Sequence, residues 1–193
     1  MLVGPDNGVF SYIWAAAPPD LIVELSNPAY LGPAISSTFH GRDIFAPVAA
    51  HIACGVPLSE LGPAVKDLVR LPIPRVDVTE ERIHGEVLYV DRFGNVITSI
   101  GRLVWDGSLL HLDPAFGGAP RAVINARQVR VLAAGCDLGP IRRTYGEMAA
   151  GQPLAVVGSE GMLELAVNRG HGAEVLGLKV GDAVEVVLRL RDS

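Results

Sequence analysis

Gly85-Glu86-Val87-Leu88-Tyr89-Val90-Asp91-Arg92-Phe93-Gly94-Asn95-Val96-Ile97-Thr98-Ser99-Ile100 is the stretch that decides the fold of the C-terminal part of this chain. Two apolar segments flank the turn residues 91–95, and this arrangement predicts a β-hairpin. Further short strands are expected between glycine-rich turns, at Ala122–Asn125, Val129–Leu132, Leu154–Val157, Leu163–Val167 and Ala183–Leu190. Strands of this length and spacing are typical of a small β-barrel or sandwich.

The residues before the hairpin mix helical and extended patterns. Apolar residues recur at helical spacing between Ile44 and Ile52, which predicts a helix that follows a turn at His40 and Gly41 and ends near Cys54. Residues Pro5–Gly8 predict a turn after the tail of a strand, and Phe10–Ala17 could be either a helix or a strand. Leu21–Leu25 predicts a buried strand, and Leu58–Gly62 predicts a short turn of helix. The N-terminal part is therefore expected to be an α/β domain.

The boundary between the two parts is expected in residues 71–81, where two prolines are followed by charged residues. Proline removes a backbone donor and favours extended chain, so this composition is typical of a linker. We therefore predict a partial α/β domain at 1–75 and a small all-β, barrel-like domain at 76–193.

Composition limits the classes of function. The chain has 193 residues, a formal charge of −5 and scattered basic residues, which argues against nucleic acid as a partner. No apolar run approaches the roughly 20 residues that span a bilayer, and the N-terminus has no signal-peptide pattern, so a cytoplasmic protein without membrane contact is expected. Cys54 and Cys136 are isolated in sequence, so they are expected to be core thiols rather than metal ligands or a disulfide.

Three polar segments could carry chemistry, and each also has a plain structural explanation. His40 could exchange a proton near neutral pH, although a lone histidine is more often structural than catalytic. Asp91–Asn95 offers a carboxylate, an aromatic face and an amide to a ligand, or is simply a hairpin turn. Gly158-Ser159-Glu160-Gly161 could hold a carboxylate on its amides, or is only a tight turn. Asn168–Gly172 is a similar polar turn, in which His171 is expected at the surface.

Taken together, five ordered segments resemble the S-adenosyl-L-methionine (SAM) hydroxide adenosyltransferases, or SAM hydrolases, which are relatives of the fluorinase and chlorinase. The resemblance covers essentially the whole chain and rests on Pro5–Gly8, Thr38–Asp43, Asp91–Asn95, Tyr145–Glu147 and Gly158–Gly161. It implies an enzyme with an N-terminal α/β domain and a C-terminal β-barrel-like domain. It also implies a homotrimer whose sites lie between neighbouring subunits, and hydrolysis of SAM to adenosine and L-methionine without a cofactor or metal.

The resemblance also implies a role for individual residues. His40 would orient or activate the attacking water, beside Thr38, Phe39 and Gly41 near the reacting carbon. Asp91 would bind the substrate ammonium. The remaining positions are implied as binding residues, Phe93, Asn95, Tyr145 and Arg169 for the adenine and Ser159 and Glu160 for the methionine end. The backbone amide of Glu160 is the expected contact, because its carboxylate would repel the carboxylate of the substrate.

This sequence departs from the family pattern at its start. Family members carry an early Thr-Asp-Phe-Gly segment and an Asp-Pro-Gly-Val-Gly segment followed by an arginine, which supply ribose contacts and the partners of the histidine. Neither segment is present, so the chain is either a truncated version of a longer reading frame or a natural remnant. The missing segments leave open a non-catalytic SAM- or adenosine-binding or structural protein. Within the family, the other alternative is a SAM-dependent halogenase, in which Tyr commonly replaces the residue at His40, so the histidine favours hydroxide.

Overall fold

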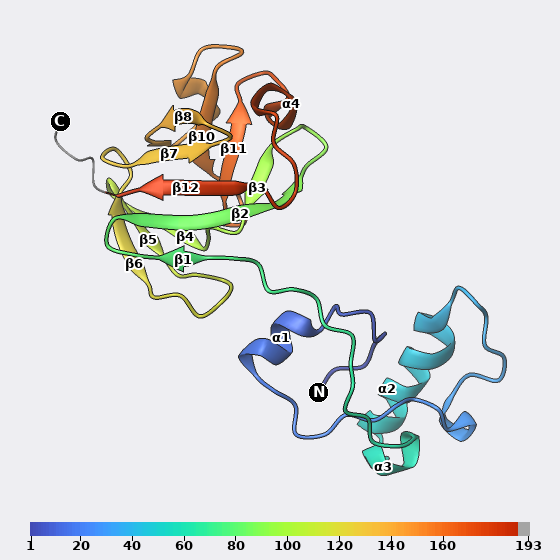
Figure 1. The fold of residues 1–193 in the computed structure, drawn as a ribbon. Coiled ribbons are helices and arrows are strands. Elements are labelled where there is room, and N and C mark those ends of the chain that lie inside the picture. The colour runs from blue at the N-terminus through green and yellow to red at the C-terminus, as the bar shows by residue number, and fades with distance from the viewer. Residues whose placement is uncertain (189–193) are drawn as a thin grey trace. The chain divides into compact units, whose positions relative to one another are not determined.

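The computed structural model describes residues 1–188, and they form two compact units (Figure 1). The first unit comprises Met1–Pro72, and the second begins at Ile73. Mixed α/β structure is confirmed for the chain as a whole. The last residues of the strand expected at Ala183–Leu190 lie outside the described residues.

The N-terminal unit consists of short helices joined by irregular segments. These are α1 (Ser11–Ala16), η1 (Pro28–Tyr30), η2 (Gly41–Phe45), α2 (Ala46–Ala53) and α3 (Leu58–Leu61). Helices after His40 and at Leu58 are thus confirmed, and the open assignment of Phe10–Ala17 resolves to a helix. The expected sheet is absent: residues 1–72 contain no strand, and their extended segments meet in a single bridge between Val23 and Ala64.

The prediction of a buried strand at Leu21–Leu25 is therefore wrong. The segment does run beside residues 61–65, because Glu24 N–H donates to Pro63 O at 2.9 Å and Val65 N–H donates to Ile22 O at 3.0 Å. Pro63 has no N–H group that could donate a hydrogen bond back to residues 21–25, so the pairing does not extend into a ladder. Leu21 is 51% exposed, which is the reverse of a core position. The first four residues likewise form no strand before the bend at Asp6–Gly8.

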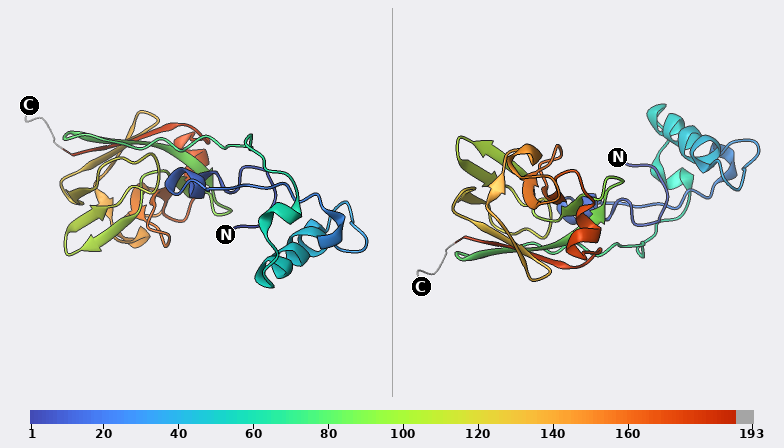
Figure 2. Two further views of the ribbon diagram at one scale, coloured as in Figure 1. Left: turned by 90° about the horizontal axis from the view of Figure 1, so that it is seen from below. Right: turned by 90° about the horizontal axis from the view of Figure 1, so that it is seen from above.

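The C-terminal unit is built on a nine-stranded sheet with the order β8-β7-β12-β2-β3-β11-β10-β9, with β1 paired to β2 outside this path. Its strands are β1 (Asp77–Val78), β2 (Arg82–Val90), β3 (Val96–Thr98), β7 (Arg130–Ala133), β8 (Cys136–Gly139), β9 (Ile141–Arg142), β10 (Pro153–Val157), β11 (Leu163–Val167) and β12 (Ala183–Val187). All neighbours are antiparallel except β9 and β10. Figures 1 and 2 show the strands curving around a common interior, as expected for a barrel-like domain.

The core of this unit explains why its main strands were predictable. Along β2, buried and partly exposed residues alternate, because one face of the strand packs inward. Ile83, Val96, Leu165 and Val186 are fully buried and belong to one apolar cluster. The hairpin of β2 and β3 pairs Val90 with Val96 and is closed by residues 91–95, as the sequence predicts.

A second, three-stranded sheet comprises β4 (Leu103–Asp106), β5 (Leu109–Leu112) and β6 (Ala122–Asn125). Only β6 was expected. Strands β4 and β5 are short and carry charged or exposed residues, so their sequences lack a long apolar alternation. Arg143 ties this sheet to the chain that follows β9, since its guanidinium stacks 4.2 Å from the ring centroid of Trp105.

The cysteines differ from the expectation. Cys54 and Cys136 were expected in a core, but both thiols are exposed. Cys54 caps the C-terminus of α2 and Cys136 begins β8 next to a glycine turn, so each lies where the chain leaves its element. Among the described residues, no helix has the length and apolar character needed to cross a membrane.

Candidate ligand-binding site

A cavity of about 390 Å³ in the C-terminal unit brings together residues from three separate stretches of the chain. Phe93 and Asn95 come from the β2–β3 loop, Tyr145 from the short helix η3 (Tyr145–Glu147), and Arg169 from the turn after β11. All four are among the residues that the sequence analysis singles out. The remaining lining residues are Val167, Asn168 and Gly170.

Asp91 shapes the loop on one side of this cavity. Its Oδ1 accepts the backbone N–H groups of Phe93 at 2.8 Å and Asn95 at 2.9 Å, and its Oδ2 accepts Nδ2 of Asn95 at 3.0 Å. Partial burial opposes ionisation, but these donors outweigh it and hold the pKa of Asp91 below its ordinary value. The carboxylate is therefore charged at neutral pH and holds the amide of Asn95 in place.

The aromatic walls of the cavity differ in their surroundings. Phe93 is 64% exposed, and the guanidinium of Arg92 lies 4.7 Å from its ring centroid. Tyr145 donates its hydroxyl proton to Oε2 of Glu164 at 2.9 Å. Burial first, and then this hydrogen bond, raise the pKa of Tyr145 to about 12, so the phenol remains neutral. Two rings with a neighbouring amide can hold a planar, hydrogen-bonding group.

The turn at 167–170 places Arg169 at the mouth of the cavity. Gly170 N–H donates to Val167 O at 3.0 Å, and Arg169 has a positive φ of 57°, which is unusual for a side chain of its size. Asn168 anchors the turn, since its Nδ2 donates to Met148 O at 2.6 Å. Such backbone strain is often found where a side chain serves a ligand.

Ser159 and Glu160 lie in the tight turn between β10 and β11. Gly161 N–H donates to Gly158 O at 3.0 Å, and Gly158 N–H donates to Met162 O at 2.9 Å. Both side-chain positions are exposed, and neither residue lines the cavity. His171, expected at the surface, is partly covered: its ring packs over Gly94, and its Nδ1 accepts the N–H of Glu174 at the start of helix α4 (Gly172–Leu176).

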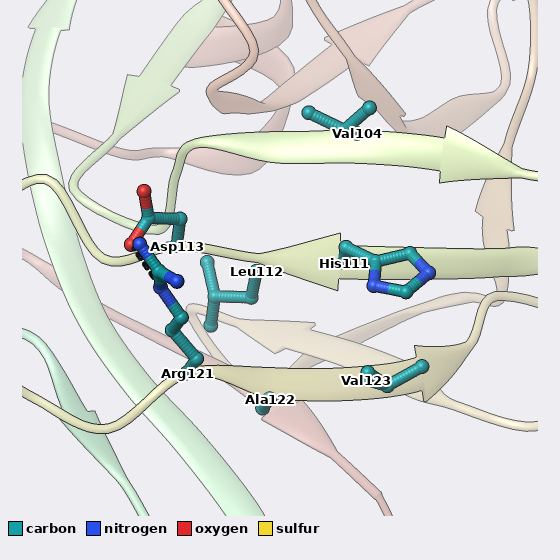
Figure 3. A pocket seen from close by; sticks show the side chains of 7 residues that line it. All are labelled: Val104, His111, Leu112, Asp113, Arg121, Ala122 and Val123. Carbon is teal, nitrogen blue, oxygen red and sulfur yellow. Dashed lines mark hydrogen bonds and ion pairs between the residues drawn. The ribbon is translucent and has the colours of Figure 1, made fainter.

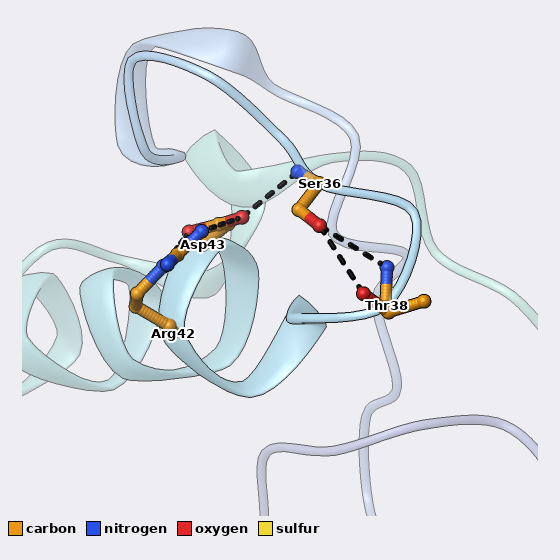
Figure 4. Close-up of polar contacts among 4 residues, drawn as sticks. All are labelled: Ser36, Thr38, Arg42 and Asp43. Carbon is orange, nitrogen blue, oxygen red and sulfur yellow. Dashed lines mark hydrogen bonds and ion pairs between the residues drawn. The ribbon is translucent and has the colours of Figure 1, made fainter.

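Thr38, Phe39, His40 and Gly41 belong to the N-terminal unit and are all exposed. His40 directly precedes the π-helix η2 that begins at Gly41, and its side chain makes no capping hydrogen bond to that helix. Figure 4 shows how the preceding loop is held: Ser36 N–H donates to Oδ2 of Asp43 at 2.8 Å, and Ser36 Oγ lies 3.4 Å from Thr38 Oγ1. The loop that carries these four residues is thereby fixed to the first turn of the helix.

Asp43 and Arg42 were assigned no role from the sequence, yet they organise this loop. Arg42 Nε donates to Oδ1 of Asp43 at 2.6 Å, and Asp43 is only 5% exposed. The Arg42 hydrogen bond and the Ser36 amide lower the pKa of Asp43 to about 2. The backbone of Asp43 makes a further contact: Pro47 has no N–H for the carbonyl of Asp43 four residues earlier, and that carbonyl accepts Gly32 N–H at 2.7 Å.

A second cavity, of about 360 Å³, lies on the three-stranded sheet (Figure 3). It is lined by Val104, His111, Leu112, Asp113, Arg121, Ala122 and Val123, with an ion pair of 2.9 Å between Arg121 Nε and Asp113 Oδ1. None of the residues expected at a site lies there. Within residues 1–188, no three His, Cys, Asp or Glu side chains gather in a way that could hold a metal ion.

Apolar and aromatic side chains together with a few polar groups, as in this cavity, are common in sites that bind small molecules. Comparison with known proteins specifies the class further. Residues 85–185 match the SAM hydroxide adenosyltransferase C-terminal domain, and residues 1–62 match the SAM hydroxide adenosyltransferase N-terminal domain. The chain belongs to the SAM hydroxide adenosyltransferase family.

Individual relatives agree with this assignment. An (R)-S-adenosyl-L-methionine hydrolase of Thermus thermophilus is 41% identical over 194 residues, covering 96% of this chain and 66% of the relative. A fluorinase of Actinopolyspora mzabensis is 29% identical over 188 residues, covering 95% of this chain and 60% of the relative. The solved structure of an uncharacterized conserved protein from Thermotoga maritima is 32% identical, with a TM-score of 0.64 over 95% of this chain and 65% of that one. The chain thus spans 60% to 66% of the length of these relatives.

Proposed function

We propose that this chain acts in the hydrolysis of SAM to adenosine and L-methionine. One observation carries the proposal: a single cavity is lined by the four residues that the resemblance implies as adenine contacts, although they come from three separate stretches of the chain, namely Phe93, Asn95, Tyr145 and Arg169. The greater identity to a hydrolase than to a fluorinase supports water rather than halide as the nucleophile.

In the proposed reaction, the oxygen of water attacks the 5′ carbon of the ribose. The carbon–sulfur bond breaks, its electron pair stays on sulfur, and methionine leaves as a neutral thioether while one proton is released. The positive charge on sulfur is lost in the transition state, so a partly desolvated pocket favours progress, and positioning of the water supplies much of the rate. A basic group near the water stabilises its hydroxide character. No cofactor or metal is needed for these steps.

Asp91 is proposed to hold the substrate ammonium. Its lowered pKa keeps the carboxylate charged at neutral pH, so it carries the negative charge that attracts an ammonium. Phe93 and Tyr145 would contact the face or edge of the adenine, Asn95 would offer its amide to the edge of the base, and Arg169 would lie at the mouth of the cavity.

The other proposed roles rest on the resemblance. The amides at Ser159 and Glu160 would receive the methionine carboxylate, and Thr38, Phe39 and Gly41 would surround the reacting carbon. His40 would orient or activate the water. A homotrimer and a cytoplasmic location belong to the same proposal, and light scattering of the purified chain tests the trimer directly.

Incubation of the chain with SAM, followed by chromatography of the products, tests the proposal. In a version that also carries the two N-terminal segments of the family pattern that this sequence lacks, we expect adenosine and methionine in equal amounts, and we expect His40→Ala to lower kcat by more than it changes KM. The 193-residue chain alone is expected to hydrolyse SAM negligibly, because those segments supply the implied partners of His40. Asp91→Ala should instead act mainly on KM, because the ammonium loses its partner. Equal losses confined to KM in both variants would contradict the assigned roles.

The two alternatives give different products in the same assay. A halogenase would form 5′-halo-5′-deoxyadenosine when chloride or fluoride is added. A non-catalytic binding protein would bind adenosine in calorimetry and release no methionine from SAM. Either result would replace the hydrolase proposal.

A further inference from the structure

Glu164 joins two parts of the C-terminal unit that the sequence analysis treats as separate. It lies on β11, between Ile97 of β3 and Val156 of β10, and is partly buried. Its Oε2 accepts the hydroxyl of Tyr145, which lines the cavity, at 2.9 Å. Its Oε1 lies against Gly158, the first residue of the turn that carries Ser159 and Glu160.

Position 158 requires a glycine because of its contact with Glu164, and not because of its backbone conformation. Its φ does not lie in the left-handed region, so other residues could adopt its conformation. A Cβ at position 158, however, would overlap the carboxylate of Glu164. The glycine therefore makes room for the carboxylate, and the carboxylate is held between the turn and the ring.

The backbone of Tyr145 is fixed independently of its side chain. Helix η3 begins with a capping box in which Thr144 N–H donates to Oε1 of Glu147 at 3.1 Å. The residue as a whole is 39% exposed. Its hydroxyl bond to Glu164 is thus the polar contact that sets the direction of the ring over the cavity, and without this bond the ring gains rotational freedom.

We propose that Glu164 is a positioning residue for ligand binding, which holds the Tyr145 ring as a wall of the cavity and links that wall to the turn at 158–161. This inference rests on the proposed function, because it takes adenosine as the ligand of the cavity. Glu164 acts through Tyr145 and does not itself need to touch the ligand.

Adenosine binding to the 193-residue chain, measured by calorimetry, tests this role. Glu164→Leu and Tyr145→Phe each remove the same hydrogen bond, and each should weaken adenosine binding by about three- to tenfold, the factor for one net hydrogen bond. Glu164→Gln keeps an acceptor and should retain most of the affinity. Gly158→Ala leaves both partners present but displaces the carboxylate, so it should resemble Glu164→Leu. The double variant of Glu164→Leu and Tyr145→Phe should bind no more weakly than either single variant, since both remove one interaction.

The matched control is Glu185→Leu. Glu185 is also a partly buried glutamate in the middle of a strand, but it pairs with Arg82 and does not line the cavity. Its substitution should leave adenosine binding unchanged. Alkaline absorbance titration adds a second readout: the pKa of Tyr145 should be lower in Glu164→Leu than in the parent chain, because the hydrogen bond to Glu164 is lost while the burial that also raises this pKa remains.

The outcomes separate the two proposals. If the parent chain does not bind adenosine, the proposed function fails and this role fails with it. If the parent binds adenosine and folded Glu164→Leu binds it equally well, only the positioning role is overturned. Should Glu164→Leu not fold, Tyr145→Phe decides the question in its place, because its change lies at a partly exposed position; undiminished binding would again overturn the role.

Discussion

Asp43 uses its carboxylate to close the loop in front of the helix, and this has a consequence at low pH. The pKa of Asp43 is lowered to about 2, whereas an unfolded aspartate titrates near its ordinary value of about 3.9. A lowered folded-state pKa means that the stabilisation is complete above the ordinary value and is lost as the pH falls through about 2.

We therefore expect Asp43→Asn to melt at a lower temperature than the parent at pH 7, and the two melting curves to converge as the pH falls from about 5 to about 2. Circular dichroism at several pH values measures this. Glu174→Gln, which changes a carboxylate on the surface of the second unit, serves as the control for the loss of one carboxylate. A constant difference between parent and Asp43→Asn at every pH would contradict the assignment.

Gly94 offers a second test at the level of one residue. It has a φ of 85°, and a Cβ at this position would overlap the ring of His171. We expect Gly94→Ala to lower the free energy of unfolding by more than Gly177→Ala, which shares a positive φ of 65° but faces open space. The control should cost about 1 kcal/mol from backbone strain alone. Urea denaturation measures both, and equal losses would show that the contact with His171 is unimportant.

At the scale of elements, the strands that could be predicted are those whose residues alternate or form a buried apolar run. Strands β2, β3, β10 and β11 meet this condition, and each of them pairs with a strand on both sides. Strand β8 contains Cys136 and Asp137, both exposed, and β9 has two residues, so neither gives a periodic signal. Helix α4 was missed because five residues are too few to show a helical period.

The central position of β11 makes its core residues costly to shorten. Leu165 is fully buried on a strand that pairs with both β3 and β10. Leu165→Ala should lower the free energy of unfolding by about 2–5 kcal/mol, because it removes buried methyl groups and leaves a cavity. Val104→Ala, at a position on β4 that is 62% exposed, should change it by less than about 0.5 kcal/mol. Urea unfolding followed by circular dichroism compares the two, and similar losses would contradict this account of the core.

At the scale of the whole molecule, the two units differ in how much apolar surface they bury. Among the described residues 1–72, Val48 and Leu61 are the buried apolar side chains, whereas the second unit has an extensive cluster. Hydrophobic burial is the main stabilising contribution, so the first unit should unfold at a lower urea concentration. Each unit contains one tryptophan, Trp14 and Trp105. In the Trp105→Phe variant, fluorescence reports on Trp14 in the first unit, and in the Trp14→Phe variant it reports on Trp105 in the second unit. The urea midpoint of the first variant should therefore be the lower one, and coincident midpoints would show one cooperative unit.

The candidate site illustrates what a sequence can and cannot indicate. The β2–β3 loop was visible because Asp, Gly and Asn form a turn between two apolar runs, and its residues 93 and 95 lie in the cavity with Tyr145 and Arg169. Glu164 gave no signal, because an acidic residue within a strand is usually solvated and its partner Tyr145 is 19 positions away. The expected N-terminal sheet could not be judged from Leu21–Leu25 alone, since a strand is stabilised by the neighbours with which it pairs.

The exposed cysteines have a practical consequence. One thiol, Cys54, lies on the first unit and the other, Cys136, on the second, and the chain has no further cysteine. A donor and an acceptor dye can therefore be attached to the unmodified sequence through maleimide chemistry, one on each unit. Single-molecule energy transfer between these dyes would report the distance between the units in solution, with and without adenosine, and would do so without introducing any substitution into the protein.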